Sequence, residues 1–243
     1  MKIIDSRDMS HLAKFRSIIA FIAFSCLAAL LLPRAGAEED YFIPVFPGAT
    51  SATIIDSYLT GPPAWGVVVD YNRLLRPGNV VRVPAHLVNL EGKAYVSTRY
   101  GETQVRLSGE DRWRETLPGL IIQRGDTLRT GPQSGIEITM ENGDRARLRE
   151  LTTVEFIPIR EGEKTNLLKV IRGKVISLIE AAPSRDIRYR IQTPTAVSLV
   201  RGTLFRTKVD ENSRTVFEVL DGTVNVQSGD EELDLESDFG IRL

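Results

Sequence analysis

Apolar and polar residues alternate with a period of two through much of the chain beyond residue 94. The pattern is clearest from Ile136 to Met140, where Ile136, Ile138 and Met140 alternate with Glu137 and Thr139. A period of two places successive side chains on opposite faces of an extended strand, so each such strand has one apolar face. We therefore predict that this part of the chain folds as β-sheet.

A β-hairpin is predicted around Asn142-Gly143, because both residue types tolerate the positive φ that tight hairpin turns require. The residues after this turn alternate again, in the order Arg145, Ala146, Arg147, Leu148 and Arg149. The three arginines then share one face, where Glu137 and Thr139 of the paired strand can lie opposite them. Two interpretations of this face remain open: a solvated surface, or a docking surface for an acidic partner.

Further turns divide the rest of the chain into short strands. Asp221-Gly222 separates two alternating runs, and Gly173 interrupts the run from Leu168 to Ile179. A glycine inside a strand pattern indicates a bulge or a close backbone approach. After Pro84 the sequence predicts no long amphipathic helix, and short strands at turn-marked spacing are typical of a sandwich or of helically wound hairpins.

The region 94–243 resembles the FecR domain family, and several phrases occur in the family's order. These are Trp113, Gly125-Asp126-x-Leu128-Arg129-Thr130-Gly131, Ser134-Gly135, Asn142-Gly143-Asp144, Arg172-Gly173-Lys174-Val175, Thr193-Pro194-Thr195-Ala196-Val197, Val200-Arg201-Gly202-Thr203-Leu204-Phe205, Asp221-Gly222-Thr223-Val224-Asn225-Val226 and Asp238-Phe239-Gly240. The resemblance implies an all-β periplasmic domain without enzyme activity. For Gly125-Asp126 we expect a turn in which the aspartate bonds to nearby backbone.

The segment 41–84 shows a different pattern, with a β-α-α-β order. Tyr41–Phe46 is a short apolar run, and Pro47-Gly48 turns it toward a helix that Thr50 or Ser51 can cap. Residues 54–59 carry apolar side chains at helical spacing, a second short helix is expected around residues 65–72, and residues 80–84 form the closing strand. Residues 85–93 are predicted to connect this module to the β-domain.

This segment resembles a LysM module. The resemblance rests on Tyr41-x-Ile43, Pro47-Gly48, the stretch from Tyr58-Leu59 to Trp65, Asp70-Tyr71-Asn72, Leu75-x-Pro77-Gly78 and Val81-x-Val83-Pro84. By resemblance, a shallow groove binds N-acetyl sugars such as those of peptidoglycan through backbone amides and carbonyls. One side would be lined by Gly48, Ala49, Thr50 and Ser51, and the other by Asn72, Arg73, Leu74, Leu75 and Arg76. The family usually has Gly-Asp-Thr-Leu where this chain has Gly48-Ala49-Thr50-Ser51, so an idle groove stays open, with Tyr58, Leu59 and Trp65 as core residues.

Residues 1–37 are predicted to be a signal peptide. A basic start precedes an uncharged apolar run of 16 residues, Ser17 to Leu32, and Ala35-Gly36-Ala37 provides the small residues of a cleavage site. The run is short for a membrane-spanning helix, which needs about 20 residues, although a retained anchor remains an alternative. We expect a periplasmic or secreted protein. Cys26 lies inside the apolar run, so the mature chain would contain no cysteine.

The charge of the mature chain argues against nucleic acid as a partner. The predicted leader contains five bases and two acids, so its removal moves the formal charge from −1 to about −4. Nucleic-acid binders usually carry a basic excess that neutralises phosphates.

No set of residues in the sequence matches a catalytic or metal-binding motif. His86 would be the sole histidine of the mature chain and lies in the predicted connector, away from any cysteine or carboxylate cluster. No nucleophile elbow, glycine-rich phosphate loop or calcium loop occurs. We therefore expect a non-enzymatic protein with no cofactor and no metal.

Together these patterns predict a cell-envelope binding protein that attaches to peptidoglycan and presents its β-domain to an envelope protein not identified by the sequence. A second hypothesis is a periplasmic sensor in transmembrane sigma-factor signalling. We expect it less, because the 16 residues before the apolar run are too few for a folded cytoplasmic regulator. A cell-wall hydrolase is a third hypothesis, which the lack of a catalytic motif disfavours.

Overall fold

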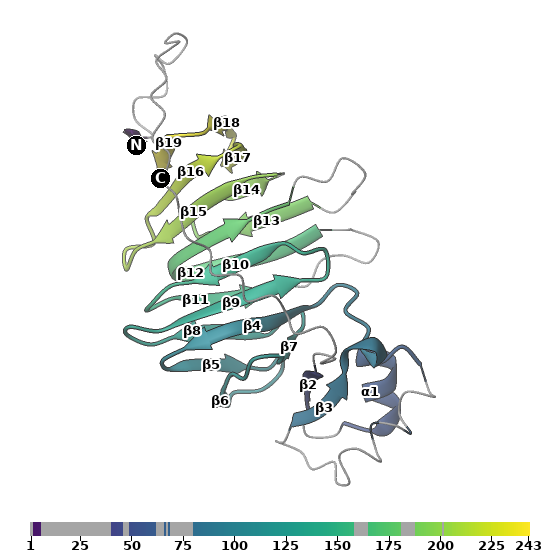
Figure 1. Ribbon diagram of the computed structural model, residues 1–243. Coiled ribbons are helices and arrows are strands. Elements are labelled where there is room, and N and C mark those ends of the chain that lie inside the picture. The colour runs from purple at the N-terminus through teal and green to yellow at the C-terminus, as the bar shows by residue number, and fades with distance from the viewer. Residues whose placement is uncertain are drawn as a thin grey trace, which may run out of the picture.

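A computed structural model describes residues 2–5, 40–45, 49–61, 66, 68, 80–157, 165–180, 188–200 and 202–243. Strands dominate these residues, with one short α-helix among the named elements (Figure 1). The predicted mainly β fold class is confirmed. Residues 2–5 of the predicted leader form a strand that pairs with residues 239–242. Residues 6–39, with Cys26, lie outside the described residues, so cleavage of the leader stays a prediction.

The N-terminal module begins with β2 (Asp40–Pro44), which pairs antiparallel with β3 (Val80–Pro84). Between them in sequence lies α1 (Ser51–Tyr58). Gly66 and Val68, in the segment where the second helix is predicted, are helical, and most of that segment lies outside the described residues. The order strand, helix, strand agrees with the prediction for residues 41–84, whereas the complete β-α-α-β module stays a prediction.

The start of α1 is set by Thr50, whose side chain accepts a hydrogen bond from the Thr53 N–H at 3.2 Å. The Thr53 hydroxyl in turn accepts from the Thr50 N–H at 2.9 Å, which completes a capping box. Ile54 and Tyr58, four residues apart, are buried on the same side of the helix. This helix is therefore held by its cap at one end and by its apolar face.

The β-domain has two layers of strands. The first layer contains β7 (Ile121–Ile122), β4 (Ala94–Tyr100), β9 (Gly135–Met140), β10 (Arg145–Leu148), the second half of β12 (Thr165–Leu178), β15 (Leu204–Val209), β16 (Thr215–Asp221), β19 (Phe239–Arg242) and β1 (Lys2–Asp5). The second contains β6 (Trp113–Glu115), β5 (Thr103–Arg106), β8 (Thr127–Thr130), β11 (Thr153–Phe156), the first half of β12, β13 (Arg188–Gln192), β14 (Val197–Val200), β17 (Thr223–Ser228) and β18 (Glu231–Glu236).

The long strand β12 joins the two layers. Its first half pairs parallel with β13 and its second half pairs antiparallel with β15. At the change of layer Gly173 has a φ of +98°, and a Cβ there would lie 2.8 Å from the Leu151 carbonyl oxygen. The predicted close approach at this glycine is confirmed, since only a residue without Cβ fits the corner.

One apolar core fills the space between the layers. It includes Ile138 and Phe205 from the first layer and Leu128, Ile191 and Val224 from the second, all of them buried. Each contributes the apolar half of an alternating strand, as the period of two predicts.

The N-terminal module shares a second core with the β-domain. Ile121 of β7 is fully buried in the cluster that contains Ile43, Ile54 and Val83 of the module. The backbone N–H of Phe42 also donates to the Gly119 carbonyl at 2.8 Å. The two parts are therefore packed against each other and not merely tethered by the connector.

The predicted hairpin at Asn142-Gly143 joins β9 and β10 in the expected register, and its turn differs from the predicted type. Gly143 has a φ of +89°, whereas Asn142 is not among the residues with positive φ. The Met140 N–H donates to the Asp144 carbonyl at 2.8 Å, and the Gly143 N–H donates to Met140 at 2.9 Å. Three residues thus form the loop, so a single left-handed residue closes it.

The turn at Asp221-Gly222 links strands of different layers. β16, before it, pairs with β15 and β19 in the first layer, and β17, after it, pairs with β14 and β18 in the second. Gly222 has a φ of +90° and passes close to the Gly202 carbonyl. A turn motif in the sequence does not by itself distinguish a hairpin between two paired strands from a turn that takes the chain from one layer to the other.

Candidate functional site

The structure describes only part of the predicted glycan groove. Ala49, Thr50 and Ser51 lie at the start of α1, where Ala49 is half-buried and the other two are exposed. Gly48 and the opposite wall, Asn72 to Arg76, lie outside the described residues. The Thr50 hydroxyl and N–H both take part in the capping box. This residue would therefore contact a sugar mainly by packing against it. Glycan binding stays a prediction.

Two aromatic or apolar residues near the predicted groove are core residues. Tyr58 is fully buried and Leu59 is buried, which agrees with the interpretation of both as core side chains. Burial raises the pKa of the Tyr58 hydroxyl. Neither side chain is available to stack on a sugar. Trp65, the third residue of that interpretation, lies outside the described residues.

Asp126 is the most strongly perturbed carboxyl group among the described residues, and its contacts are structural. Its two carboxylate oxygens accept from the backbone N–H groups of Ser108 at 2.8 Å and Gln123 at 2.9 Å. Burial raises the pKa of Asp126 to about 6, even though these two hydrogen bonds act to lower it. The predicted turn role of Gly125-Asp126 is confirmed.

The described residues show no metal centre. They contain no group of three or more His, Cys, Asp or Glu side chains that could hold a metal ion. His86 is exposed in the short 3-10 helix Ala85–Leu87. In the same residues no helix has the length and hydropathy needed to cross a bilayer.

The arginine-bearing strand β10 pairs with the acidic face of β9 as predicted. Arg147 lies opposite Glu137, and its Nη2 and Nε both bond one carboxylate oxygen, at 2.6 and 3.0 Å. Arg145 and Arg149 are exposed. The arginine row is therefore partly neutralised by its own sheet.

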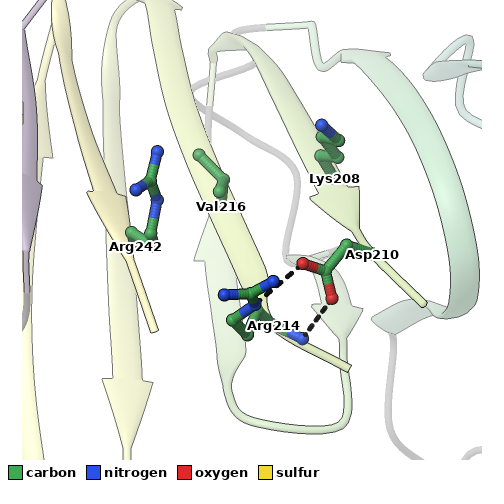
Figure 2. A pocket seen from close by; sticks show the side chains of 5 residues that line it. All are labelled: Lys208, Asp210, Arg214, Val216 and Arg242. Atoms are coloured by element: carbon green, nitrogen blue, oxygen red, sulfur yellow. Dashed lines mark hydrogen bonds and ion pairs between the residues drawn. The ribbon is translucent and has the colours of Figure 1, made fainter. Parts of the chain in front are cut away.

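A shallow cavity of about 230 Å³ lies where β15, β16 and β19 run side by side (Figure 2). Its walls carry three cations and one acid, namely Lys208, Arg214, Arg242 and Asp210, with Val216 between them. Asp210 binds Arg214 through a side-chain contact of 2.9 Å and also accepts from the Arg214 backbone N–H at 3.0 Å. The cavity therefore has an excess of positive charge.

Sequence reasoning missed this cavity because Arg242 of β19 joins residues of the β15–β16 hairpin only through strand pairing. Lys208 lies opposite Val216, and Val216 lies opposite Arg242, in the strand register. The period of two shows which side of each strand a residue occupies, and only the pairing shows which residues become neighbours.

The comparison with protein families agrees with the architecture of the β-domain. Residues 126–225 match the family described as FecR protein. The FecR match begins beside β8, ends within β17, and includes strands of both layers. It also contains the phrases Arg172–Val175 and Thr193–Val197, on which the resemblance rested. Trp113 lies before it.

Two solved structures align with part of this chain. Two crystal structures of a candidate anti-sigma factor from Parabacteroides distasonis each align with a TM-score of 0.43 and 17% sequence identity. Each alignment covers 48% of this chain and 54% of the other, so the chain spans about half the length of the solved chain. No curated protein matches the sequence.

Proposed function

We propose that this protein is a non-catalytic binding protein of the bacterial cell envelope. Its N-terminal module attaches to peptidoglycan or another N-acetyl sugar polymer, and its FecR-like β-domain presents a surface to an envelope protein. The FecR match over residues 126–225 supports the role of the β-domain, because it coincides with a two-layer β-domain whose outer faces are charged. The attachment rests on the resemblance of residues 41–84 to a LysM module. The predicted signal peptide supports export to the periplasm.

The shared core between module and β-domain supports a combined role. Ile121 belongs to the β-domain in sequence and packs with Ile43 and Val83 of the module. A ligand held by the module would therefore hold the β-domain in a defined orientation. For one shallow groove we expect affinity of about micromolar or weaker, because such a site buries little surface.

A pull-down with purified peptidoglycan tests the attachment. Deleting residues 41–84 would uncover Ile121, so point variants in the predicted groove, Asn72→Ala and Leu75→Ala, are a cleaner test. Arg112→Ala, an exposed change outside the groove, is the matched control. We expect the control to sediment with peptidoglycan and the groove variants to stay in solution. Retention of the unaltered protein in the supernatant would refute attachment.

A role as periplasmic sensor in transmembrane sigma-factor signalling is the second candidate. The same FecR match favours it at least as strongly as the first proposal. Cross-linking in cells followed by identification of the partners distinguishes the two. Recovery of a sigma factor together with an outer-membrane transporter would favour sensing, whereas recovery of cell-wall components alone would favour attachment.

A further inference from the structure

Four cations fall into one row across the first layer of the β-domain, three of them in strands and the fourth, Arg149, directly after β10. Lys174 of β12 lies opposite Lys208 of β15, which lies opposite Val216 of β16, which lies opposite Arg242 of β19. At the other end the Arg149 N–H donates to the Lys174 carbonyl at 2.9 Å. We call Arg149, Lys174, Lys208 and Arg242 the cationic row.

The cationic row faces solvent on one side of the layer. Residues directly opposite each other on paired strands project from the same face. Arg149, Lys208 and Arg242 are exposed, and Lys174 is half-buried. Neighbouring strands lie about 4.8 Å apart, so the four strand steps from Arg149 to Arg242 span about 19 Å. The row runs near the edge at which the β10–β11 and β15–β16 turns lie, on the left in Figure 1.

The next row of the same face neutralises itself, whereas the cationic row has one acid in register, Asp5 of β1 opposite Arg242 at its end. In the next row Glu137 pairs with Arg147 at 2.6 Å, and Arg206 pairs with Glu218 at 2.8 Å. Within the described residues, none of the four cations of the cationic row has an ion-pair partner. Lys174 and Lys208 also lie directly opposite each other, an arrangement of like charges that disfavours the folded state. An anionic ligand would relieve this repulsion.

The cavity described above forms one end of the cationic row. Figure 2 shows Lys208 and Arg242 on either side of Val216, with Arg214 held below them by Asp210. Its volume of about 230 Å³ is sufficient for a single carboxylate group. The row thus combines a line of positive charge with a recess at one end.

We propose that the cationic row binds an extended acidic segment of a partner protein. This proposal rests on the proposed function and states which chemistry the partner of the β-domain would present. A span of about 19 Å corresponds to about six residues of extended chain. The positive charge is one side chain wide because the adjacent row is neutralised, so it complements a line of carboxylates better than the plane of an anionic membrane. One carboxylate of the segment occupies the cavity between Lys208 and Arg242.

Binding of a synthetic peptide in which Glu and Thr alternate tests this proposal, with fluorescence anisotropy of the labelled peptide at low ionic strength as the readout. A peptide of alternating Gln and Thr is the ligand control. The protein variants are Lys208→Gln with Arg242→Gln, in the cationic row, and Arg112→Gln with Arg129→Gln, which remove the same charge from exposed positions outside it. Circular dichroism verifies that all variants fold.

We expect the Glu peptide to bind about threefold to tenfold more weakly to the row variant, since each exposed pair contributes modestly. The control variant should bind nearly as well as the unaltered protein, and the Gln peptide should not bind. Equal weakening by both variants would overturn the proposal, because net charge alone would then explain binding. Absence of saturable binding by the Glu peptide would also overturn it.

Two further measurements address other occupants. If phosphatidylglycerol vesicles bind with a stronger dependence on the row than the peptide does, the row contacts a membrane and the proposal is wrong. If sedimentation shows self-association that the row variant abolishes, a second copy occupies the row and the proposal is wrong. If the Glu peptide does not bind but the protein still sediments with peptidoglycan, the proposal for the cationic row is wrong and the proposed function stands.

Discussion

At the scale of single residues, Asp126 shows how a buried carboxyl group can organise a turn. Its oxygens satisfy two backbone N–H groups that come from different parts of the chain, at Ser108 and Gln123. The same burial that makes these bonds effective disfavours the charged form. The side chain is therefore structural, although a perturbed carboxyl group is often a sign of a functional site.

The raised pKa of Asp126 predicts a specific dependence of stability on pH. Because the folded state keeps this proton up to about pH 6 and the unfolded state loses it near pH 3.8, the folded state binds more protons between these values. The free energy of unfolding then falls as pH rises through this window, by about 3 kcal/mol at most.

Asp126→Asn removes this titration and provides the comparison. The loss of stability between about pH 4 and pH 7 should be smaller in the variant by about 2–3 kcal/mol, measured from urea unfolding at both values. All other groups titrate equally in both proteins and cancel in the difference. Parallel pH profiles for the two proteins would show that the pKa of Asp126 is not raised.

At the scale of elements, β12 makes one strand serve both layers, and Gly173 makes this possible. We expect Gly173→Ala to cost about 2–5 kcal/mol of unfolding free energy, from the left-handed backbone and the clash with residues 151 and 152. Gly109→Ala is the matched control, because Gly109 has a φ of +76° and no atom within 4 Å of the added Cβ. The control should cost only about 1–2 kcal/mol. Equal costs would mean that the close packing at the corner contributes nothing.

The strand β18 illustrates how an edge is kept from pairing with other chains. Among the described residues it pairs only with β17, and its outward residues Glu232 and Asp234 are exposed acids that accept bonds from Asn225 at 2.9 and 2.8 Å. Charged residues on an edge strand oppose edge-to-edge association.

Replacing both acids of this edge, Glu232→Val with Asp234→Val, should therefore promote aggregation while changing stability by no more than about 1 kcal/mol. Light scattering during incubation measures the association. The control is Glu211→Val with Asp230→Val, which removes the same charge from exposed turn positions. Similar scattering by both double variants would point to net charge and not to the edge.

At the scale of the whole molecule, the module and the β-domain are joined by a common core. The aromatic rings of Tyr41 and Tyr95 meet across this junction with centroids 4.9 Å apart, and Ile121 fills its centre. A substitution in the β-domain that removes packing at this junction should therefore destabilise the module, although the module lies elsewhere in the sequence.

Ile121→Ala tests this coupling, with Leu128→Ala as the control in the core between the layers. Both should cost about 2–4 kcal/mol of unfolding free energy. Hydrogen exchange should speed up in β2 and β3 for Ile121→Ala and not selectively for Leu128→Ala. An unchanged exchange rate in β2 and β3 would show that the module is stable without the β-domain.

Local sequence determined much of the secondary structure. The alternation from Ile136 to Met140 and the signature Asn142-Gly143 predicted the β9–β10 hairpin and the pairing of Arg147 with Glu137, because these interactions join residues close in the chain. The bond of Asp126 to Gln123 in the turn was predictable for the same reason, whereas its bond to Ser108 was not. At Gly173 and Gly222 the sequence indicated only a glycine in a strand or turn, and not that the chain passes from one layer to the other there.

Tertiary structure alone decided which strands became neighbours, and hence the cationic row. Lys174, Lys208 and Arg242 look like ordinary solvated side chains in the sequence, since each lies in its own alternating strand. Their alignment depends on the pairing of β12, β15, β16 and β19, which pack on the core between the two layers. A period of two specifies the face of a strand that is buried and not the identity of the strand beside it.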